Sequence, residues 1–320
     1  MSPRRRCWAA GERAPVSRDD QIVAILGAGA FGRALAAVAG KTGPVRLIGR
    51  RPAEGVETDA AAGLVGAGLV IIAVPAQATR AALGVWAPRL PQGAPLILAA
   101  KGLEAGSSLL QSEIAAALTP GRQLMALTGP AFAVDLIAGL PTAVTLATND
   151  EAAGRAAQLR LAGPTLRPYL SDDIIGAEIG GALKNVVAIA CGAAIGRGLG
   201  ESARAALMTR GFAEMTRIAL AKGGRAETLA GLSGLGDLAL TTASEKSRNF
   251  AFGLTLGRGE APEPGVTREG VATAGAAAAL AARLGVEAPI IEAVARLAAG
   301  RSGIDAEMAG LLSRPLGRES

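Results

Sequence analysis

The 320-residue sequence contains no histidine. Serine–histidine–aspartate triads, histidine acid–base pairs and the usual histidine-containing zinc sites are therefore excluded. The single tyrosine, Tyr169, has no lysine four residues further on, which also excludes a Tyr-x-x-x-Lys dehydrogenase site. Proton transfer has to come from another side chain, and lysine is the leading candidate.

Cysteines and aromatic residues are also scarce. The two cysteines, Cys7 and Cys191, lie in an N-terminal tail and an expected helix, so no disulfide framework is expected, and a reducing cytoplasm is the predicted location. Aromatic residues make up 2% of the chain, and two of its +6 net charges come from that tail. Without a dense basic block or aromatic side chains to stack on bases, we expect no nucleic-acid partner. The basic balance suits an anionic small molecule instead.

Long apolar runs are missing as well. No apolar run of about 18 or more residues is free of ionisable groups, so we expect no integral membrane segment. Residues 1–20 contain an arginine cluster but no apolar core of a signal peptide, and they are expected to form a flexible tail. At this length two domains are the default for the rest of the chain.

Hydrophobic patterns divide the remaining chain into two parts. Residues 21–172 alternate strand and helix patterns, which predicts an α/β domain with a doubly wound (Rossmann-like) parallel sheet. Residues 173–320 contain long segments rich in alanine and leucine, which predict an all-α, substrate-binding domain. An active site is expected in the cleft between the two. Expected strands lie at 22–26, 45–50, 68–75, 94–101, 124–130, 142–148 and 166–170, and expected helices of the second domain at 174–195, 202–221, 267–284 and 289–299.

The first strand leads into a Gly-x-Gly-x-x-Gly motif formed by Gly27, Gly29 and Gly32. Between a strand and a helix this motif predicts a dinucleotide site, because the backbone can approach a pyrophosphate and the helix N-terminus offers free N–H groups. The second strand ends in Arg50 and Arg51, where an acidic residue would bind the ribose of NAD. Two guanidinium groups suit a 2′-phosphate, so NADP(H) is the expected preferred cofactor, with NAD(H) as a second.

Lys184 stands inside the stretch "GGALKNVVAIACG", residues 180–192. From Ile179 to Gly196, its ammonium group and the Cys191 thiol are the only ionisable side chains. A buried, unpaired ammonium is strongly unfavourable or loses its proton more easily. Lys184 therefore lies either on a wet stripe of its helix or inside the protein for a functional reason.

Four short stretches carry a family resemblance: "KGLE" at 101–104, "GPAFA" at 129–133, "GGALKN" at 180–185 and "GLGDLALTTASEKSRN" at 234–249. With "GAGAFG" at 27–32 and "REG" at 268–270, they resemble NAD(P)-dependent glycerol-3-phosphate dehydrogenase in order and spacing. The likeness extends from about Gln21 to beyond Gly300. It implies reversible reduction of dihydroxyacetone phosphate to sn-glycerol 3-phosphate, which supplies phospholipid synthesis in organisms with similar enzymes.

The resemblance also implies roles for individual residues. Lys184 would donate the proton to the substrate carbonyl oxygen, and Lys101 would polarise or orient the substrate. The implied substrate-binding residues are Lys101, Gly129, Ala131, Lys184, Asp237, Ser247, Arg248 and Asn249. Motif and resemblance together give a cofactor-binding set of Gly27, Gly29, Ala30, Phe31, Gly32, Arg50, Arg51, Lys101, Ala133, Arg248, Thr267 and Glu269, and no metal is expected.

One position departs from the family pattern. Ala131 stands where the family's turn usually has serine. The missing hydroxyl removes one substrate hydrogen bond, worth about 0.5–1.5 kcal/mol, and predicts a weaker KM rather than lost activity.

The chemistry of the residues agrees with these roles. A lysine whose pKa is lowered by burial or by a second lysine is a workable acid near neutral pH. Arg248, at the start of an expected helix, suits a phosphate group.

Alternatives remain open at this point. The chain could be a related NADP-dependent ketone or hydroxyacid reductase, such as a ketopantoate reductase, or a non-catalytic NADP-binding regulator. Asp237 could also serve as a simple helix N-cap. A homodimer formed through the helical domain is a further expectation.

Overall fold

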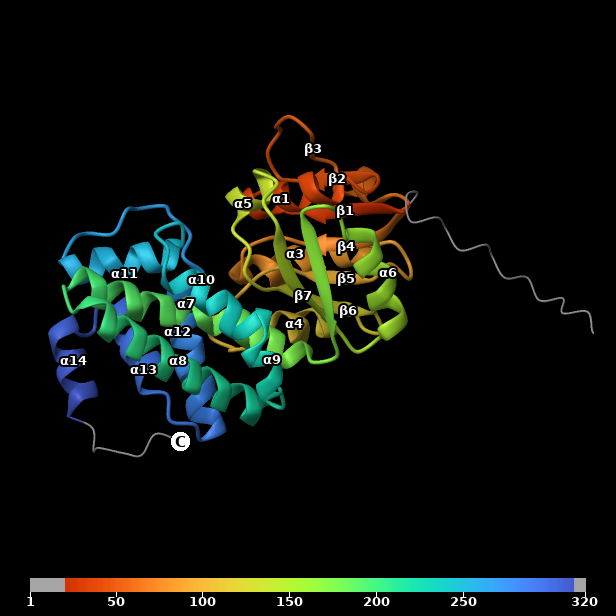
Figure 1. Cartoon of the computed structure of the whole chain (residues 1–320). Coiled ribbons are helices and arrows are strands. Elements are labelled where there is room, and N and C mark those ends of the chain that lie inside the picture. Colours follow the sequence, from red (N-terminus) through yellow and green to blue (C-terminus); the bar gives the residue numbers. More distant parts are fainter. Residues whose placement is uncertain (1–20, 314–320) are drawn as a thin grey trace, which may run out of the picture.

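The computed structural model describes residues 21–313, which form a sheet domain and a helical domain side by side (Figure 1). The expected flexible tail at 1–20 lies outside the described residues. The sheet domain contains β1 to β8 and α1 to α6, and every later element is a helix. The predicted combination of an α/β domain with an all-α domain is therefore confirmed.

Eight strands form one sheet in the described part of the chain, in the order β3-β2-β1-β4-β5-β6-β7-β8. The strands are β1 (Ile22–Leu26), β2 (Val45–Ile48), β3 (Val56–Glu57), β4 (Ala67–Ile72), β5 (Leu96–Leu98), β6 (Leu124–Thr128), β7 (Thr142–Thr148) and β8 (Leu166–Ser171). The helices of this domain are α1 (Ala30–Ala39), α2 (Ala60–Leu64), α3 (Thr79–Trp86), α4 (Gln111–Leu118), α5 (Ala133–Ile137) and α6 (Glu151–Leu161).

The expectation of an entirely parallel sheet is wrong at its far edge. The strands from β3 to β6 run parallel, whereas β7 pairs antiparallel with β6, and β8 then follows β7 in parallel. The cause is the connection after β6, whose short helix α5 packs against α1. The chain therefore does not cross the sheet, and β7 runs back antiparallel beside β6.

Both faces of the central strands are buried, which explains their nearly continuous apolar sequences. Val23 and Ile25 of β1 pack with residues of α1 on one face. Ala24 and Leu26 point the other way and pack with residues that include Leu83 of α3. Successive side chains of a strand thus pack into the apolar layers on the two faces of the sheet. The carboxyl ends of the strands are not covered by these layers and can present side chains to a ligand.

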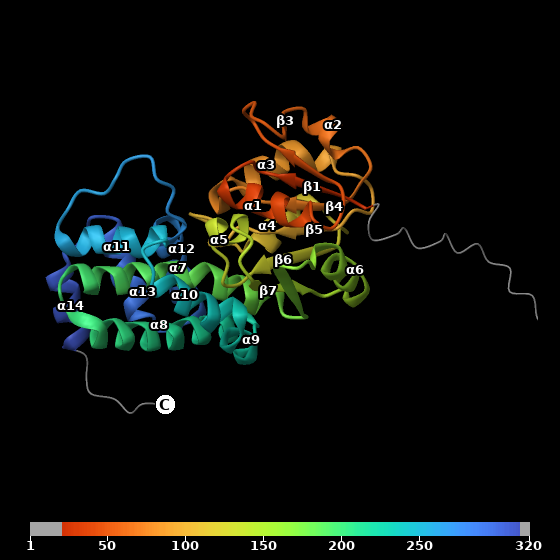
Figure 2. The ribbon, with the colours of Figure 1, turned by 45° about the horizontal axis from the view of Figure 1, so that its top comes forward.

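The helical domain is built around α7 (Ile174–Gly196). Figure 2 shows α11 and α8 on opposite sides of α7, and α10, α12 and α13 also pack against it. The helices after α7 are α8 (Gly200–Lys222), α9 (Ala226–Ala230), α10 (Asp237–Thr242), α11 (Arg248–Arg258), α12 (Glu269–Leu284), α13 (Pro289–Ala298) and α14 (Ile304–Leu312), with a π-helical turn at Leu232–Gly236. By length and composition α7 could cross a membrane, but it is almost entirely buried among the protein's own elements.

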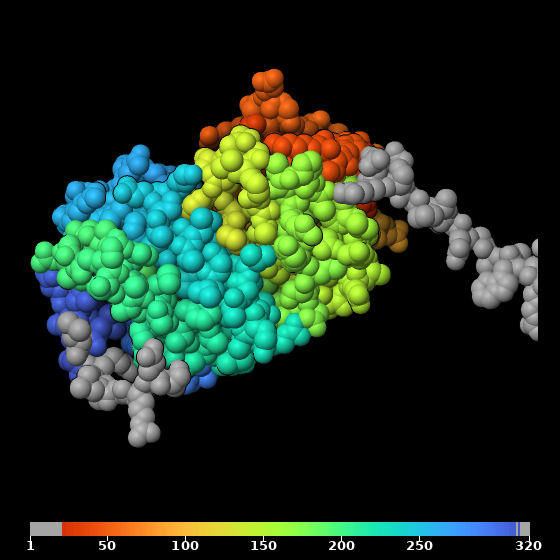
Figure 3. Space-filling model, viewed as in Figure 1, coloured from red at the N-terminus to blue at the C-terminus, as the bar shows by residue number. Residues whose placement is uncertain are grey.

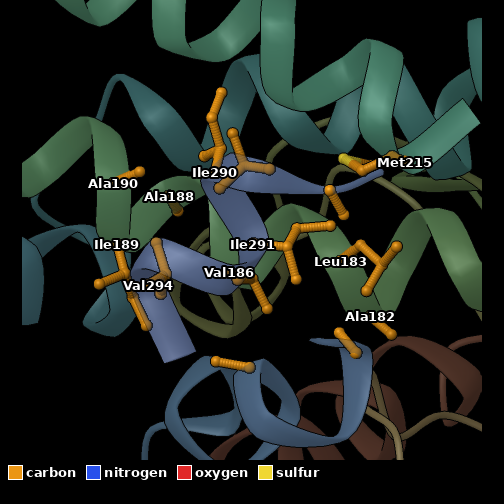
Figure 4. Packing of buried hydrophobic residues seen from close by; sticks show 14 of the residues in the cluster. Ala182, Leu183, Val186, Ala188, Ile189, Ala190, Met215, Ile290, Ile291 and Val294 are labelled. Carbon is orange, nitrogen blue, oxygen red and sulfur yellow. The ribbon is translucent and has the colours of Figure 1, made fainter. Parts of the chain in front are cut away.

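Small residues let these helices pack closely. A Cβ on Gly253 of α11 would overlap the carbonyl oxygen of Ile189, and a Cβ on Gly192 of α7 would overlap that of Phe250. Elsewhere α7 is surrounded by larger apolar side chains, such as Met215 and Ile291 (Figure 4). This packing makes α7 a rigid support for Lys184.

Candidate active site

The glycine turn after β1 brings three chain segments close together. Gly27 has φ +123, and a Cβ there would lie 2.5 Å from the carbonyl oxygen of Ala73, while a Cβ on Gly32 would overlap the carbonyl of Gly27 itself. Gly29, in contrast, faces open space and is the N-cap of α1, without a side-chain cap among the described residues. An open turn that leads into an uncapped helix start fits a pyrophosphate, with Ala30 and Phe31 in the first helical turn.

The two arginines expected to bind the cofactor directly follow a residue that packs against this turn. Gly49, directly after β2, is so close to the turn that its Cβ would lie 2.7 Å from the Cβ of Ala28. Arg50 and Arg51 follow immediately, and both are exposed. Their position fits the ribose phosphate of a dinucleotide whose pyrophosphate occupies the turn.

Lys101, Lys184 and Asp237 meet where the two domains touch. Asp237 is 1% exposed, and its two carboxylate oxygens accept hydrogen bonds from Lys184 Nζ at 2.8 Å and from Lys101 Nζ at 2.7 Å. Lys184 is 6% exposed and also donates to the hydroxyl of Thr241 at 2.8 Å. Burial and pairing exclude the wet helix stripe that the sequence left open for Lys184.

Burial and charge change the proton affinities of this cluster. The pKa of Lys184 is lowered to about 8. Burial is the main cause, Asp237 acts in the opposite direction, and the neighbouring Lys101 contributes to the lowering. For Asp237, burial raises the pKa, but the two ammonium groups outweigh that effect, so the pKa stays below its ordinary value. A lysine with a pKa near 8 is mostly protonated at neutral pH and still gives up its proton readily.

Lys101 connects this cluster with the glycine turn after β1. Its ammonium group donates to the carbonyl of Gly129 at 2.6 Å and lies 5.9 Å from the centroid of the Phe31 ring. Gly129 has φ +128 and directly follows β6, while Ala131 lies just before α5 and Ala133 is the first residue of that helix. The lysine thus contacts both the first turn of α1 and the Gly-Pro turn after β6.

The segment before α11 meets α5 on the surface of the molecule (Figure 3). Lys246 Nζ lies 3.0 Å from a carboxylate oxygen of Asp135 on α5. The next two residues, Ser247 and Arg248, differ in their exposure to solvent. Ser247 is buried and its hydroxyl accepts the N–H of Phe250, so it caps α11, whereas Arg248 is exposed in the first helical turn.

Asn249 is committed to partners within the protein. Its amide donates to the side-chain oxygen of Asn185 at 2.9 Å, and its own oxygen accepts the N–H of Gly270 at 3.0 Å. Asn185 in turn donates to the carbonyl of Lys101 at 3.2 Å. Asn185 on α7 and Asn249 on α11 therefore link the loop between β5 and α4, which contains Lys101 and is called the Lys101 loop below, to the start of α12.

The two predicted cofactor positions near α12 lie differently. Glu269 is the first residue of α12, and its carboxylate accepts the N–H of Ala76 at 3.2 Å, just beyond β4. Burial raises its pKa, while the Ala76 hydrogen bond and Arg248 lower it. Thr267 is exposed in the preceding loop. Glu269 therefore reaches the sheet domain, and Thr267 does not take part in that contact.

Two side chains of the cluster were missed from sequence. Thr241 lies four residues after Asp237 on α10, and its hydroxyl donates to that carboxylate at 3.2 Å. The i, i+4 spacing in "DLALT" was the available signal. Asn185 directly follows Lys184, and only the fold shows that it reaches the Lys101 loop.

Within residues 21–313, no group of three or more histidine, cysteine, aspartate or glutamate side chains could hold a metal.

A dinucleotide-binding sheet joined to a helical domain, with a charged lysine pair at the junction, defines the class of two-domain nicotinamide-dependent dehydrogenases. Sequence models of the NAD-dependent glycerol-3-phosphate dehydrogenase N-terminus and C-terminus match residues 54–154 and 173–309. The chain belongs to the NAD-dependent glycerol-3-phosphate dehydrogenase family.

Individual relatives agree with this membership. The chain is 51% identical to the glycerol-3-phosphate dehydrogenase [NAD(P)+] of Cereibacter sphaeroides, with 93% of this chain and 100% of the relative covered. It is 48% identical to the enzyme of the same name from Caulobacter vibrioides, over 93% and 98% of the two chains. The crystal structure of glycerol-3-phosphate dehydrogenase from Coxiella burnetii has a TM-score of 0.86 and 34% identity, and covers 92% of this chain and 99% of its own.

Proposed function

We propose that the protein reduces dihydroxyacetone phosphate to sn-glycerol 3-phosphate with NAD(P)H, and catalyses the reverse oxidation. The observation that carries this proposal is the Lys101–Asp237–Lys184 cluster beside the dinucleotide turn. It combines a buried proton donor with a net positive charge, which a ketone carrying a phosphate requires. Family membership supports the same substrate.

A bound nicotinamide supplies the hydride for C2 of the ketone. The protein has to protonate the oxygen on which negative charge develops, and Lys184 performs that step. An ammonium group has three N–H bonds, and Asp237 and Thr241 accept two of those on Lys184. The third remains for the substrate oxygen. In the oxidation direction, the neutral amine accepts the hydroxyl proton.

Lys101 acts as the second cation. Gly129 and Asp237 accept two of its N–H bonds, which leaves the third for the substrate. Its charge stabilises the developing alkoxide and lowers the pKa of Lys184. Asp237 fixes both ammonium groups and balances one of the two charges, so the pair can exist in a buried site.

Arg248 binds the phosphate group of the substrate. It is the exposed member of the predicted Ser247-Arg248-Asn249 run and belongs to the first turn of α11, where N–H groups and the helix dipole also favour an anion. Arg50 and Arg51 bind the 2′-phosphate of NADP(H), which makes NADP(H) the preferred cofactor.

The test measures NADPH oxidation with dihydroxyacetone phosphate, for the wild type beside Lys184→Ala and with NADH in parallel. We expect turnover that falls by several orders of magnitude in the variant while NADPH binding persists. Folded wild type that binds NADPH without reducing this substrate would contradict the proposal and favour a regulator. Faster reduction of ketopantoate would favour the related reductase.

The cellular setting is a separate part of the proposal. Supply of glycerol 3-phosphate for phospholipid synthesis follows from the reaction, and the cytoplasm fits a chain with few cysteines. A homodimer through the helical domain stays a prediction, and sedimentation of the purified protein tests it.

A further inference from the structure

Helix α4 begins without a cap from its own N-cap residue, because Leu110 has a hydrocarbon side chain. Two acidic residues take over that role. The Glu113 carboxylate accepts the N–H of Leu110 at 2.8 Å. Glu178, on α7 of the helical domain, accepts the N–H of Ser112 at 3.0 Å and also the Ser112 hydroxyl. A helix of the sheet domain is therefore capped by a carboxylate from the other domain.

Burial makes the charged form of Glu178 energetically unfavourable at this position. It is 8% exposed, and its pKa is raised to about 7. Burial is the main cause and the nearby Glu113 carboxylate adds to it, whereas the hydrogen bonds from Ser112 act in the opposite direction. Lys222 of α8 pairs with Glu113, at 2.5 Å. No step of the proposed reaction uses Glu178. Because burial disfavours the ionised form of Glu178, its presence here needs an explanation other than catalysis.

The position of Glu178 on α7 suggests one. Glu178, Gly181 and Asn185 are spaced i, i+3 and i+7, so they lie on one face of the helix. Asn185 binds the carbonyl of Lys101. A Cβ on Gly181 would lie 3.6 Å from Lys101 Cγ and would overlap the Thr128 hydroxyl. This face of α7 therefore supports the chain from Lys101 to Ser112 at both of its ends.

A further hydrogen bond connects the two ends. Gln111, the first residue of α4, donates from its side chain to the carbonyl of Gly102 at 2.8 Å and is 1% exposed. Fixing the start of α4 therefore fixes the residue next to Lys101. Lys184 follows Glu178 by six residues on the same rigid helix.

We propose that Glu178 is a positioning residue, which holds Lys101 at its working distance from Lys184 by anchoring the start of α4 on α7. The inference rests on the proposed function of Lys101 in binding and polarising the substrate. Through this contact, α7 sets the separation of the two lysines, although they belong to different domains. Without it, the loop between β5 and α4 can shift relative to the helical domain.

Glu178→Gln tests the proposal, because the amide keeps the size of the side chain and one acceptor but loses the charge. We expect kcat/KM for dihydroxyacetone phosphate to fall about tenfold, while the Kd of NADPH stays within about twofold. Glu214→Gln is the matched control. Glu214 is 2% exposed and caps α13 by accepting the N–H groups of Ile290 and Ile291, entirely within the helical domain. It should lower Tm and leave kcat/KM unchanged.

A double-mutant cycle separates positioning from general damage. In a Lys101→Met background, Glu178→Gln should change kcat/KM by less than about twofold, because the ammonium group that Glu178 positions is then absent. Equal losses in both backgrounds, or the same loss in Glu214→Gln, would overturn the inference. If Lys101→Met alone leaves kcat/KM unchanged, the role of Lys101 itself is wrong, and the inference about Glu178 falls with it.

Two further measurements cover practical failures. If Glu178→Gln does not fold, Ser112→Ala removes the hydroxyl donor alone and should give a smaller loss of the same kind. If Lys101→Met is too slow to assay, the Kd of glycerol 3-phosphate measured by calorimetry replaces kcat/KM in the cycle.

Discussion

Lys101 and Lys184 bind the two oxygens of one buried carboxylate, although they come from different domains. The Nζ atoms lie 2.7 Å and 2.8 Å from Oδ2 and Oδ1 of Asp237. Two ammonium groups and one carboxylate leave a single net positive charge at the junction. That charge is available to a developing alkoxide, and the carboxylate limits the repulsion that would otherwise drive a proton off one lysine.

Replacing the shared carboxylate should move the pH dependence of the reaction. Asp237 raises the pKa of Lys184, so Asp237→Asn should lower that pKa below its value of about 8. Reduction needs protonated Lys184, and its rate falls as pH rises through this pKa. The alkaline limb of kcat/KM for dihydroxyacetone phosphate should therefore shift to lower pH in the variant, measured across the neutral to alkaline range.

Thr241→Val provides the control for this prediction. It removes a neutral hydrogen-bond partner of Lys184 at 2.8 Å and leaves the charge of Asp237 in place. Its alkaline limb should stay close to that of the wild type. An unmoved limb in Asp237→Asn, with activity still measurable, would mean that Lys184 does not set it.

Sequence patterns predicted more of the fold than of the site's internal contacts. Strand and helix periodicity is local, and it located β1, the glycine turn and α7. The reversal of β7 was missed, because it depends on where α5 packs and not on any pattern in β7 itself. Period alone does not distinguish a parallel from an antiparallel edge strand.

The site shows the same limit. The isolation of Lys184 in an apolar stretch indicated that it needs a partner, but that partner, Asp237, lies 53 residues away in the chain. The family motif singled out both residues without revealing that they pair. Glu178 had no signal, because a lone glutamate near a helix start is ordinary in sequence. Its contact with Ser112 spans 66 residues and exists only in the folded chain.

Glycine in α11 should be required where its backbone touches α7. A Cβ on Gly253 would overlap the carbonyl oxygen of Ile189, so Gly253→Ala should destabilise the protein by about 1–3 kcal/mol. Gly275 of α12 is the matched control: it is helical, exposed and has nothing within 4 Å of a new Cβ. Gly275→Ala should stabilise by about 0.5–1 kcal/mol. Urea unfolding of both variants measures the difference, and equal effects would contradict the close packing.

Cofactor preference should depend on the two arginines after β2. Arg50→Gln and Arg51→Gln remove charge from exposed side chains beside the glycine turn. We expect KM for NADPH to rise about tenfold in the double variant, while KM for NADH changes by less than about twofold, because only NADPH carries the 2′-phosphate. Parallel assays with both cofactors measure this ratio. Equal changes for both would place the 2′-phosphate elsewhere.

Stability should decline as pH rises from about 5 to 7, and Glu214 should account for part of the decline. Burial raises its pKa from 4.5 to about 7, although the N–H groups of Ile290 and Ile291 lower it. Between these values the folded protein binds more protons than the unfolded chain, so raising the pH favours unfolding. The slope for one such group is at most about 1.4 kcal/mol per pH unit.

Glu214→Gln removes this titration and should flatten the curve of unfolding free energy against pH. Glu178, whose pKa is also raised to about 7, keeps its own share of the slope in that variant. Urea unfolding at pH values from about 5 to 7 should therefore give a shallower but still falling curve, as linkage requires of the remaining raised acid. Parallel curves for wild type and variant would show that Glu214 has the same proton affinity in the folded and unfolded chains.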